Sequence, residues 1–345
     1  MPSELENAMA RFRRQLLQQE RAAASQMVRA YGESWARIRV DILRVQRQLA
    51  AGDTTPWRIQ QDARLQSVQA QIEAELRRFA PYAAQSATQM QQAAIDAAAR
   101  NAGQAIEAAG GPSMTMRFDK LNTGAVESLV GFASDGSPLQ ALFEDIGQGV
   151  APRMTATLAQ GIALGWNPRV TAREMRAAYG MGLSRALTMA RTETLRAYRE
   201  STAQVYQRNA DILEGWIWVC ACDRRSCASC WAMHGSLHAL DERLDDHPNG
   251  RCAMAPKVRD RPNRIGATGA ERFAALSADD QRYILGPGMY EGWKDGQVSL
   301  SPYGANSIVG RRDDAQWGTM RHARSLRDVV GPDAAREYSR IAAAG

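Results

Sequence analysis

Cysteine and histidine side chains gather in one stretch of the chain, residues 216–256, which holds all five cysteines and three of the four histidines. Cys227 and Cys230 form a C-x-x-C pair, and His247 and Cys252 follow inside H-P-N-G-R-C. Two thiolates in a tight turn and a second pair of soft ligands on a returning loop are a ligand set typical of one tetrahedral zinc ion. The spacing predicts a structural zinc site at these four residues.

Two other uses of the cysteines stay open, a disulfide and free thiols, although the odd total of five argues against the fully paired framework of a secreted protein. Cys220 and Cys222 alternate with apolar residues beside two tryptophans, so we interpret them as strand packing. His234 and His238 are reserve ligands, because a lone histidine is more typical of a surface or half-buried position. Packing of the tryptophans is the alternative to a metal for holding this lobe together.

The segments before this stretch are predicted to be helical. Apolar residues from Tyr31 to Leu49 recur at steps of three and four, which marks one face of a helix, and a second stripe runs from Leu65 to Phe79 after a Thr55-Pro56 start signal. Pro81 is expected to interrupt that helix, and a third, alanine-rich helix follows over residues 83–109. The stripes predict a hairpin or coiled-coil arm that packs on itself, on another copy or on a partner, with an ordinary helical bundle as the alternative.

Four further helices are predicted between the glycine-rich boundary at Gly110-Gly111-Pro112 and the cysteine stretch. The first begins at Ser137-Pro138, and the second covers Val150 to Leu164. The third starts at a capping box of Thr171 and Glu174, and the fourth runs from Leu183 to about Asn209. The β signals come next, in residues 216–222, 236–240 and 251–258, and predict a small antiparallel sheet beside the proposed metal. Beyond them, Ser277 is expected to cap a short helix and a last helix covers residues 332–343.

These patterns together predict an α+β fold that is mostly α-helical. It comprises a long N-terminal helical arm (1–111), a helical middle domain (112–212), a small antiparallel β lobe rich in Cys and His (213–260) and a mixed C-terminal segment (261–345). The length of 345 residues suits two or three structural units.

The composition excludes several classes of protein. No apolar run approaches the length of a membrane span, and the N-terminus lacks the profile of a signal peptide, so a reducing cytoplasm is expected. The net charge of +6 would tolerate a polyanionic neighbour, but both signs are interspersed. No P-loop, dinucleotide fingerprint, nucleophile elbow or deaminase signature occurs, so no catalytic or cofactor-binding residues are assigned. Asp245 and Asp246 precede His247, but spacing alone gives them no role.

The cysteine stretch and its surroundings resemble the phage head morphogenesis family, the minor head proteins similar to the F protein of phage Mu. The resemblance lies in A-R-T-E-T (Ala190–Thr194) on a long helix, W-x-W before Asp223, the D-R-R-S-C-A-S-C-W-A-M-H-G run and H-P-N-G-R-C-x-x-x-P. A downstream segment from Phe273 to Gly286 extends it to roughly residues 120–330. Gly250 is a departure, because the family pattern H-P-N-C-R-C has a cysteine there.

The resemblance implies a structural protein of the phage head and not an enzyme. On this reading it acts in capsid assembly inside the virion, near the portal vertex, with the portal and other capsid proteins as partners, possible contact with packaged phage DNA and no membrane. It also implies a structural contact for Arg191 and Glu193, toward the cysteine lobe, in place of a catalytic role. The alternatives are a metal-dependent nuclease centred on the His247 loop and a zinc-stapled DNA-binding module, whose affinity would depend strongly on salt.

Overall fold

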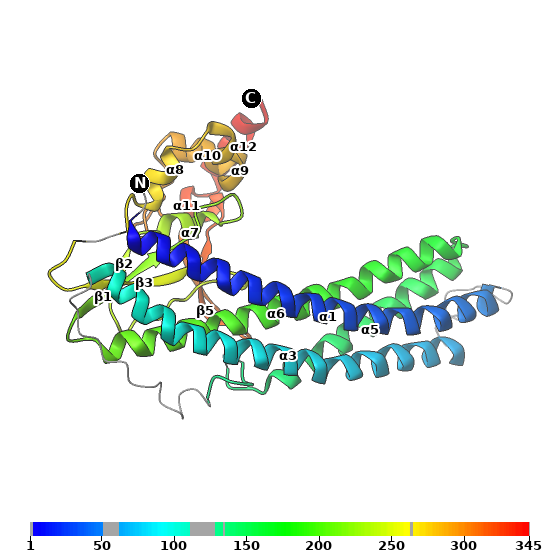
Figure 1. Cartoon of the computed structure of the whole chain (residues 1–345). Helices are drawn as coiled ribbons and strands as arrows, with labels where there is room; N and C mark the ends of the chain where they lie inside the picture. The colour runs from blue at the N-terminus through cyan, green and yellow to red at the C-terminus, as the bar shows by residue number, and fades with distance from the viewer. Residues whose placement is uncertain (1–2, 51–61, 111–127, 134, 263–264, 345) are drawn as a thin grey trace. The chain divides into compact units, whose positions relative to one another are not determined.

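Helices dominate the molecule, and short antiparallel strands make up the rest of its regular structure (Figure 1). A computed structural model describes residues 3–50, 62–110, 128–133, 135–262 and 265–344. Its elements are α1 (Glu4–Ala50), α3 (Ala63–Gly110), α5 (Leu139–Ala163), α6 (Pro168–Arg208), β1 (Leu213–Val219), α7 (Ala228–Met233), β2 (Leu237–His238), β3 (Ala253–Val258), α8 (Gly269–Ala274), α9 (Ala278–Leu285), α10 (Pro287–Lys294), β4 (Val309–Asp314), β5 (Gly318–Ala323), α11 (Leu326–Val330) and α12 (Pro332–Ala344). The predicted fold class is confirmed.

Two compact units divide the chain. The lobe unit comprises Met1–Leu16, Ala94–Val126 and Leu195–Gly345, and the helical unit comprises Leu17–Ala93 and Glu127–Thr194. The boundaries fall inside α1, α3 and α6, so each of these helices contributes to both units. The predicted four-part division of the chain stays a prediction.

The helical unit is held by the apolar stripes that the sequence predicts. Tyr31 of α1 lies against Phe79 of α3, with ring centroids 4.8 Å apart, and against Tyr179 of α6, at 4.2 Å. Its hydroxyl also donates to the carbonyl of Tyr179 at 2.8 Å, which satisfies a buried polar atom. Ile42 and Ile72, from the two stripes, are almost fully buried.

Three helices are longer than predicted. Pro81 lies inside α3 and Pro152 inside α5, although proline removes one backbone hydrogen bond and normally kinks or ends a helix. In α3, buried side chains on both sides of Pro81, including Phe79 and Ala83, hold the helix together by tertiary packing. Thr171 caps nothing, because α6 already begins at Pro168, and the buried Thr171 hydroxyl instead accepts a hydrogen bond from Gln46. The Thr55-Pro56 start signal and the glycines after Gly110 lie outside the described residues.

The core of the lobe unit surrounds a three-stranded antiparallel sheet in the order β2-β1-β3. Trp216, Ile217, Trp218 and Val219 of β1 are all buried, although successive side chains of a strand point to opposite faces. The reason is that this strand is covered on both faces. Among its neighbours in the core cluster are Leu5, Ala8, Met9 and Phe12 of α1 and Ala102, Ala105 and Ile106 of α3. The ends of the predicted arm therefore share a core with the Cys/His lobe.

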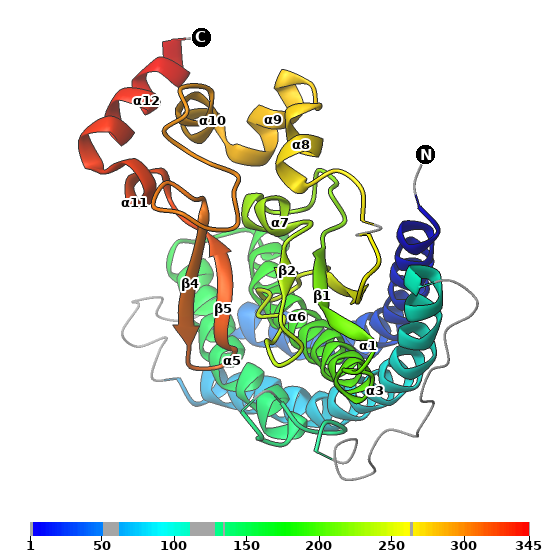
Figure 2. The ribbon, with the colours of Figure 1, turned by 90° about the vertical axis from the view of Figure 1, so that its left-hand side faces the viewer.

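The C-terminal part contains predicted and unpredicted elements. Ser277 caps α9 through a hydrogen bond from the backbone of Asp280, and α12 closes the chain, both as predicted. The β4–β5 hairpin was not predicted, because V-G-R-R-D-D carries charges where a strand pattern needs alternating apolar residues. Helix α7 packs beside this hairpin, which Figure 2 shows next to the sheet of the lobe. None of the described helices combines the length and apolar character that crossing a membrane requires.

Candidate metal centre

The C-x-x-C pair lies at the start of α7. Cys227 is the N-cap of this helix, and its sulfur accepts a hydrogen bond from the backbone N–H of Cys230 at 3.4 Å. The turn brings the two Sγ atoms to 3.2 Å from each other, much farther than the ~2.05 Å of a disulfide, and all five cysteines are free thiols. Both sulfurs are thus available to bind one metal ion.

The H-P-N-G loop brings His247 to the same place. Gly250 closes a turn by donating its N–H to the carbonyl of His247 at 2.9 Å, with Pro248 second and Asn249 third at a φ of 61°, a position that asparagine tolerates well. The Nε2 atom of His247 lies 3.2 Å from the Cys227 sulfur and 3.5 Å from that of Cys230. Its Nδ1 atom is 2.9 Å from the Pro248 carbonyl, an acceptor, so Nδ1 carries a proton and Nε2 faces the two sulfur atoms.

A buried ion pair fixes the loop on α6. Arg199 donates to Asp246 Oδ2 at 2.7 Å, and the side chains of the two residues are 10% and 1% exposed. The same guanidinium donates to the carbonyls of Gly250, at 3.0 Å, and Cys252, at 2.9 Å. Asp246 also accepts the backbone N–H groups of His247 at 2.9 Å and Cys252 at 3.2 Å. Five hydrogen bonds therefore set the path of the loop that carries His247.

A second ion pair joins the two halves of the cysteine pattern. Arg251, on the returning loop, donates to both carboxylate oxygens of Asp223, which begins the D-R-R-S-C turn, with one contact at 2.7 Å. Such a two-point contact is geometrically specific. The Arg251 guanidinium holds the pKa of the Asp223 carboxyl well below its usual range. The turn with Cys227 and the loop with His247 are thereby fastened to each other without a metal.

The protonation of the site suits metal binding. The pKa of the Cys227 thiol is lowered to about 4, first by the hydrogen bond from Cys230 and then by His247, against the opposing effect of burial. The pKa of His247 is raised to about 9, mainly by its hydrogen bond to Cys227. A thiolate is the form of cysteine that binds metals. The metal-free site is thus a thiolate–imidazolium pair, and a divalent cation would replace the imidazolium proton.

Of the four predicted ligands, three meet directly and the fourth lies beside them. Candidate ligand atoms of Cys227, Cys230 and His247 are all within 4.8 Å of one another, and those of Cys230, Asp246 and Cys252 form a second such group. Cys230 belongs to both groups. The donor chemistry, two sulfurs and a correctly oriented imidazole nitrogen, fits zinc.

The remaining cysteines and histidines pack in the core. Cys220 and Cys222 lie beyond the end of β1 at Val219, so interpreting them as strand residues is wrong. Cys220 nevertheless packs in the core, and Cys222 is half-buried at a φ of 49°. His234 and His238 are each only 3% exposed, so the expectation of surface or half-buried positions is wrong. His238 stacks on Trp216 with centroids 4.3 Å apart, and His234 accepts the N–H of Cys220 through Nδ1. Neither belongs to the two groups of ligand atoms found among the described residues.

Sequence reasoning missed the residues that position the ligands. No pattern within H-P-N-G-R-C or C-x-x-C points to Arg199, 47 positions from its partner Asp246. The A-R-T-E-T motif drew attention to the same helix, but Arg191 pairs with Glu20 at 3.0 Å inside the helical unit. Glu193 is 1% exposed, so it is not a solvated surface residue. The sequence feature that could have pointed to Arg199 is its position two helical turns after Arg191 on the same helix, α6.

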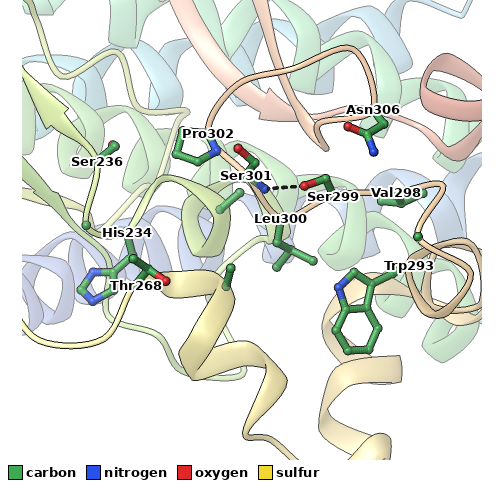
Figure 3. Close-up of a pocket in the computed structure, with 14 residues that line it drawn as sticks. His234, Ser236, Thr268, Trp293, Val298, Ser299, Leu300, Ser301, Pro302 and Asn306 are labelled. Atoms are coloured by element: carbon green, nitrogen blue, oxygen red, sulfur yellow. Dashed lines mark hydrogen bonds between the residues drawn. The ribbon is translucent and has the colours of Figure 1, made fainter.

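The lobe unit also contains a cavity of about 530 Å³ between α7, α8 and the loop after α10. Its wall includes Trp293, Leu300 and Asn306, and Figure 3 shows the His234 ring turned away from Leu300 and Trp293. The residues that line it include no carboxylate, cysteine, lysine or arginine. It therefore offers hydrogen bonds and apolar surface but no metal ligand set.

Comparison with known proteins supports the family resemblance in this region. Residues 153–255 match the family model described as Phage Mu protein F like protein. The match covers less than a third of the chain and spans α6, β1, α7, β2, the H-P-N-G-R-C loop and the first half of β3. The downstream segment from Phe273 lies outside it. No curated protein and no solved structure gives a significant match. The predicted resemblance to the phage head morphogenesis family is confirmed over the matched residues.

Proposed function

We propose that this protein is a minor head protein of a bacteriophage that acts structurally in head assembly. The observation that carries the proposal is the family match over residues 153–255, which coincides with the Cys/His lobe and the helix that positions it. In this proposal the partners are the portal and other capsid proteins, and the protein resides in the virion near the portal vertex. The net charge of +6 is compatible with contact to packaged DNA.

A structural role fits the contacts of His247 better than nuclease chemistry. A general base needs a ring nitrogen within reach of substrate. Here Nε2 faces two cysteine sulfurs and Nδ1 donates to a backbone carbonyl, so both nitrogens are engaged within the lobe. The side chain is 28% exposed. The imidazole is therefore arranged to hold the loop in place, and we propose no catalytic activity.

Within this proposal, zinc is the structural cofactor of the lobe. Cys227, Cys230 and His247 would hold it, with Cys252 as the fourth ligand that the sequence predicts. Zinc bound by four protein ligands supplies a crosslink without an open position for water. The crosslink would join the start of α7 to the H-P-N-G turn, two segments that Arg251 and Asp223 already fasten together.

Purified phage particles test the head-protein assignment. Mass spectrometry of proheads and virions is expected to find the chain in both, and cryo-electron microscopy is expected to find it at the portal vertex. Absence from proheads and virions would contradict the proposal. In parallel, plasmid DNA is incubated with divalent metals and either the wild-type protein or His247→Ala, and cleavage that depends on His247 would revive the nuclease alternative.

A further inference from the structure

Two residues compete for the fourth position of the proposed metal centre. Cys252 is the sequence-based choice, and its sulfur lies within 4.8 Å of the ligand atoms of Cys230 and Asp246. The ligand atoms of Cys227, Cys230 and His247 also lie within 4.8 Å of one another, but the Cys252 sulfur does not belong to that group. Ligand atoms around one zinc ion are about 3.3–3.8 Å from one another, as metal–ligand distances of ~2.0–2.3 Å require. The Cys252 sulfur is therefore poorly placed to complete that group.

The carboxylate of Asp246 is better placed. Its Oδ1 atom lies 3.6 Å from the Cys230 sulfur and 3.6 Å from Nε2 of His247. Together with the three distances among Cys227, Cys230 and His247, these two values fall in or near the range that one zinc ion imposes. Asp246, like Cys252, does not belong to the group of those three residues as a whole, but its Oδ1 atom lies within 4.8 Å of two of its members. The other oxygen, Oδ2, is held by Arg199 and by the backbone N–H of Cys252. A ligating carboxylate supported in this way through its second oxygen is a common arrangement in metal sites.

Gly250 explains why the carboxylate fits. A Cβ atom placed on Gly250 would overlap the carboxylate carbon and both oxygens of Asp246. The carboxylate cannot move aside cheaply, because Arg199 and two backbone N–H groups hold it. A side chain at position 250 and the carboxylate of residue 246 therefore exclude each other. Position 250 is where the family pattern has a cysteine, and a side chain there would need the space that Asp246 fills.

We propose that Asp246 replaces the cysteine missing at position 250 and supplies, through Oδ1, the oxygen ligand of a Cys227–Cys230–His247–Asp246 zinc site. Cys252 then stays outside the metal as a buried thiol. This inference rests on the proposed metal centre and revises its fourth ligand. It also gives Arg199 a positioning role, since its guanidinium holds the ligating carboxylate and the carbonyls on either side of Arg251.

The number of thiolates bound to the metal tests the proposal without any substitution. The full-length protein is reconstituted with Co²⁺, whose sulfur-to-metal charge-transfer absorption increases with each bound thiolate, and the zinc form is measured by X-ray absorption. We expect two sulfur ligands and two nitrogen or oxygen ligands. Three sulfur ligands would overturn the role of Asp246 and leave the metal centre intact. Protein that binds neither Zn²⁺ nor Co²⁺ would overturn the metal centre itself.

Substitutions give a second, independent readout in metal affinity. Asp246→Asn keeps the shape of the side chain and is expected to weaken Zn²⁺ binding by more than the about 10–100-fold typical of losing a supporting contact. Arg199→Gln is the matched control and is expected to stay within that range. Cys252→Ala is expected to retain one equivalent of zinc and an unchanged Co²⁺ spectrum, and loss of metal in this variant would contradict the proposal.

The double variant Asp246→Ala with Gly250→Cys completes the experiment. Removal of the carboxylate makes room for a side chain at position 250, so we expect metal binding to return with three thiolates in the Co²⁺ spectrum. Gly250→Cys alone is expected to lower metal affinity, because the new side chain collides with Asp246. Equal affinity for Gly250→Cys and the double variant would show that the two side chains do not share a space and would overturn the inference.

Discussion

The helical unit and the Cys/His lobe are stabilised in different ways. In the helical unit, apolar stripes pack along α1, α3 and α6, and ion pairs such as Arg37–Glu75 reach the surface, with the arginine 53% exposed. In the lobe, charged pairs such as Arg199–Asp246 are buried and join residues far apart in the chain. Asp245 repeats this pattern by accepting from Arg321 of β5 at 2.7 Å. Periodic packing therefore builds the helical unit, while specific polar contacts over long sequence separations shape the site.

The largest difference between the two units is expected for Arg199→Gln. Removing one partner leaves the 1% exposed Asp246 carboxylate without its cation, which typically costs about 3–5 kcal/mol. Chemical denaturation in the presence of a chelator measures this loss without a contribution from metal. Arg199→Lys keeps the charge but not the planar fork, so it is expected to recover only part of the stability. If Arg199→Gln lowered the free energy of unfolding by less than about 1 kcal/mol, the lobe would not depend on its buried ion pairs more than the helical unit does on its exposed ones.

A matched pair of core substitutions compares the apolar packing. Leu5→Ala and Ile72→Ala each remove a fully buried side chain and are each expected to cost about 2–5 kcal/mol. Because Leu5 packs in the same cluster as β1 and β3, Leu5→Ala is expected to speed hydrogen exchange in residues 213–258. Ile72→Ala is expected to leave that region unchanged. Normal protection of the sheet in Leu5→Ala would mean that the start of α1 is not part of the lobe core.

Acid sensitivity is expected to differ because His234, a buried histidine with a lowered pKa, belongs to the lobe unit. Burial lowers the pKa of His234 from 6.5 to about 4, so the unfolded chain takes up the proton first as pH falls. The stability from this group is complete above pH 6.5 and is lost between pH 6.5 and 4, by about 3 kcal/mol at most. In His234→Asn the amide oxygen replaces Nδ1 as acceptor for the Cys220 N–H.

Denaturation of wild type and His234→Asn across that pH range isolates the contribution of this histidine. The difference in stability between the two proteins is expected to change steadily as the pH falls from 6.5 to 4. A constant difference would mean that His234 does not titrate on unfolding in the way its burial requires.

The smallest effect is expected for Arg37→Gln in the helical unit. Its partner Glu75 lies 2.8 Å away, but the arginine side chain is mostly exposed, so solvent screens the pair. We expect a loss of about 0–1 kcal/mol, which denaturation in low and high salt would measure. A loss as large as that of Arg199→Gln would show that the helical unit also depends on its ion pairs.

The sequence predicted what depends on local periodicity. The stripes of α1 and α3, the strands around the cysteine pair and the cap at Ser277 all follow from spacings within one element. Pro81 misled the prediction because tertiary packing outweighs the lost hydrogen bond. The charged hairpin β4–β5 was missed because Arg311 and Arg321 are placed by Asp245, outside the hairpin.

The candidate site was predicted only in its ligand types. Cys227, Cys230 and His247 come together as their spacing indicates, since a helix start and a tight turn are local structures. The exclusion between Gly250 and Asp246 could not be predicted, because it depends on how Arg199 of a distant helix holds the carboxylate. A contact between residues so far apart in the chain leaves no periodic pattern in the sequence.

Metal content tests the central claim most directly. Protein purified without added metal is expected to contain about one equivalent of zinc, with Cys227 and Cys230 protected from alkylation until a chelator is added. Cys230→Ser is expected to lose the metal and several kcal/mol of stability in the lobe, whereas Cys220→Ser retains it. Metal-free protein in which Cys227 and Cys230 remain equally protected would contradict the account and leave burial or a disulfide as the explanation.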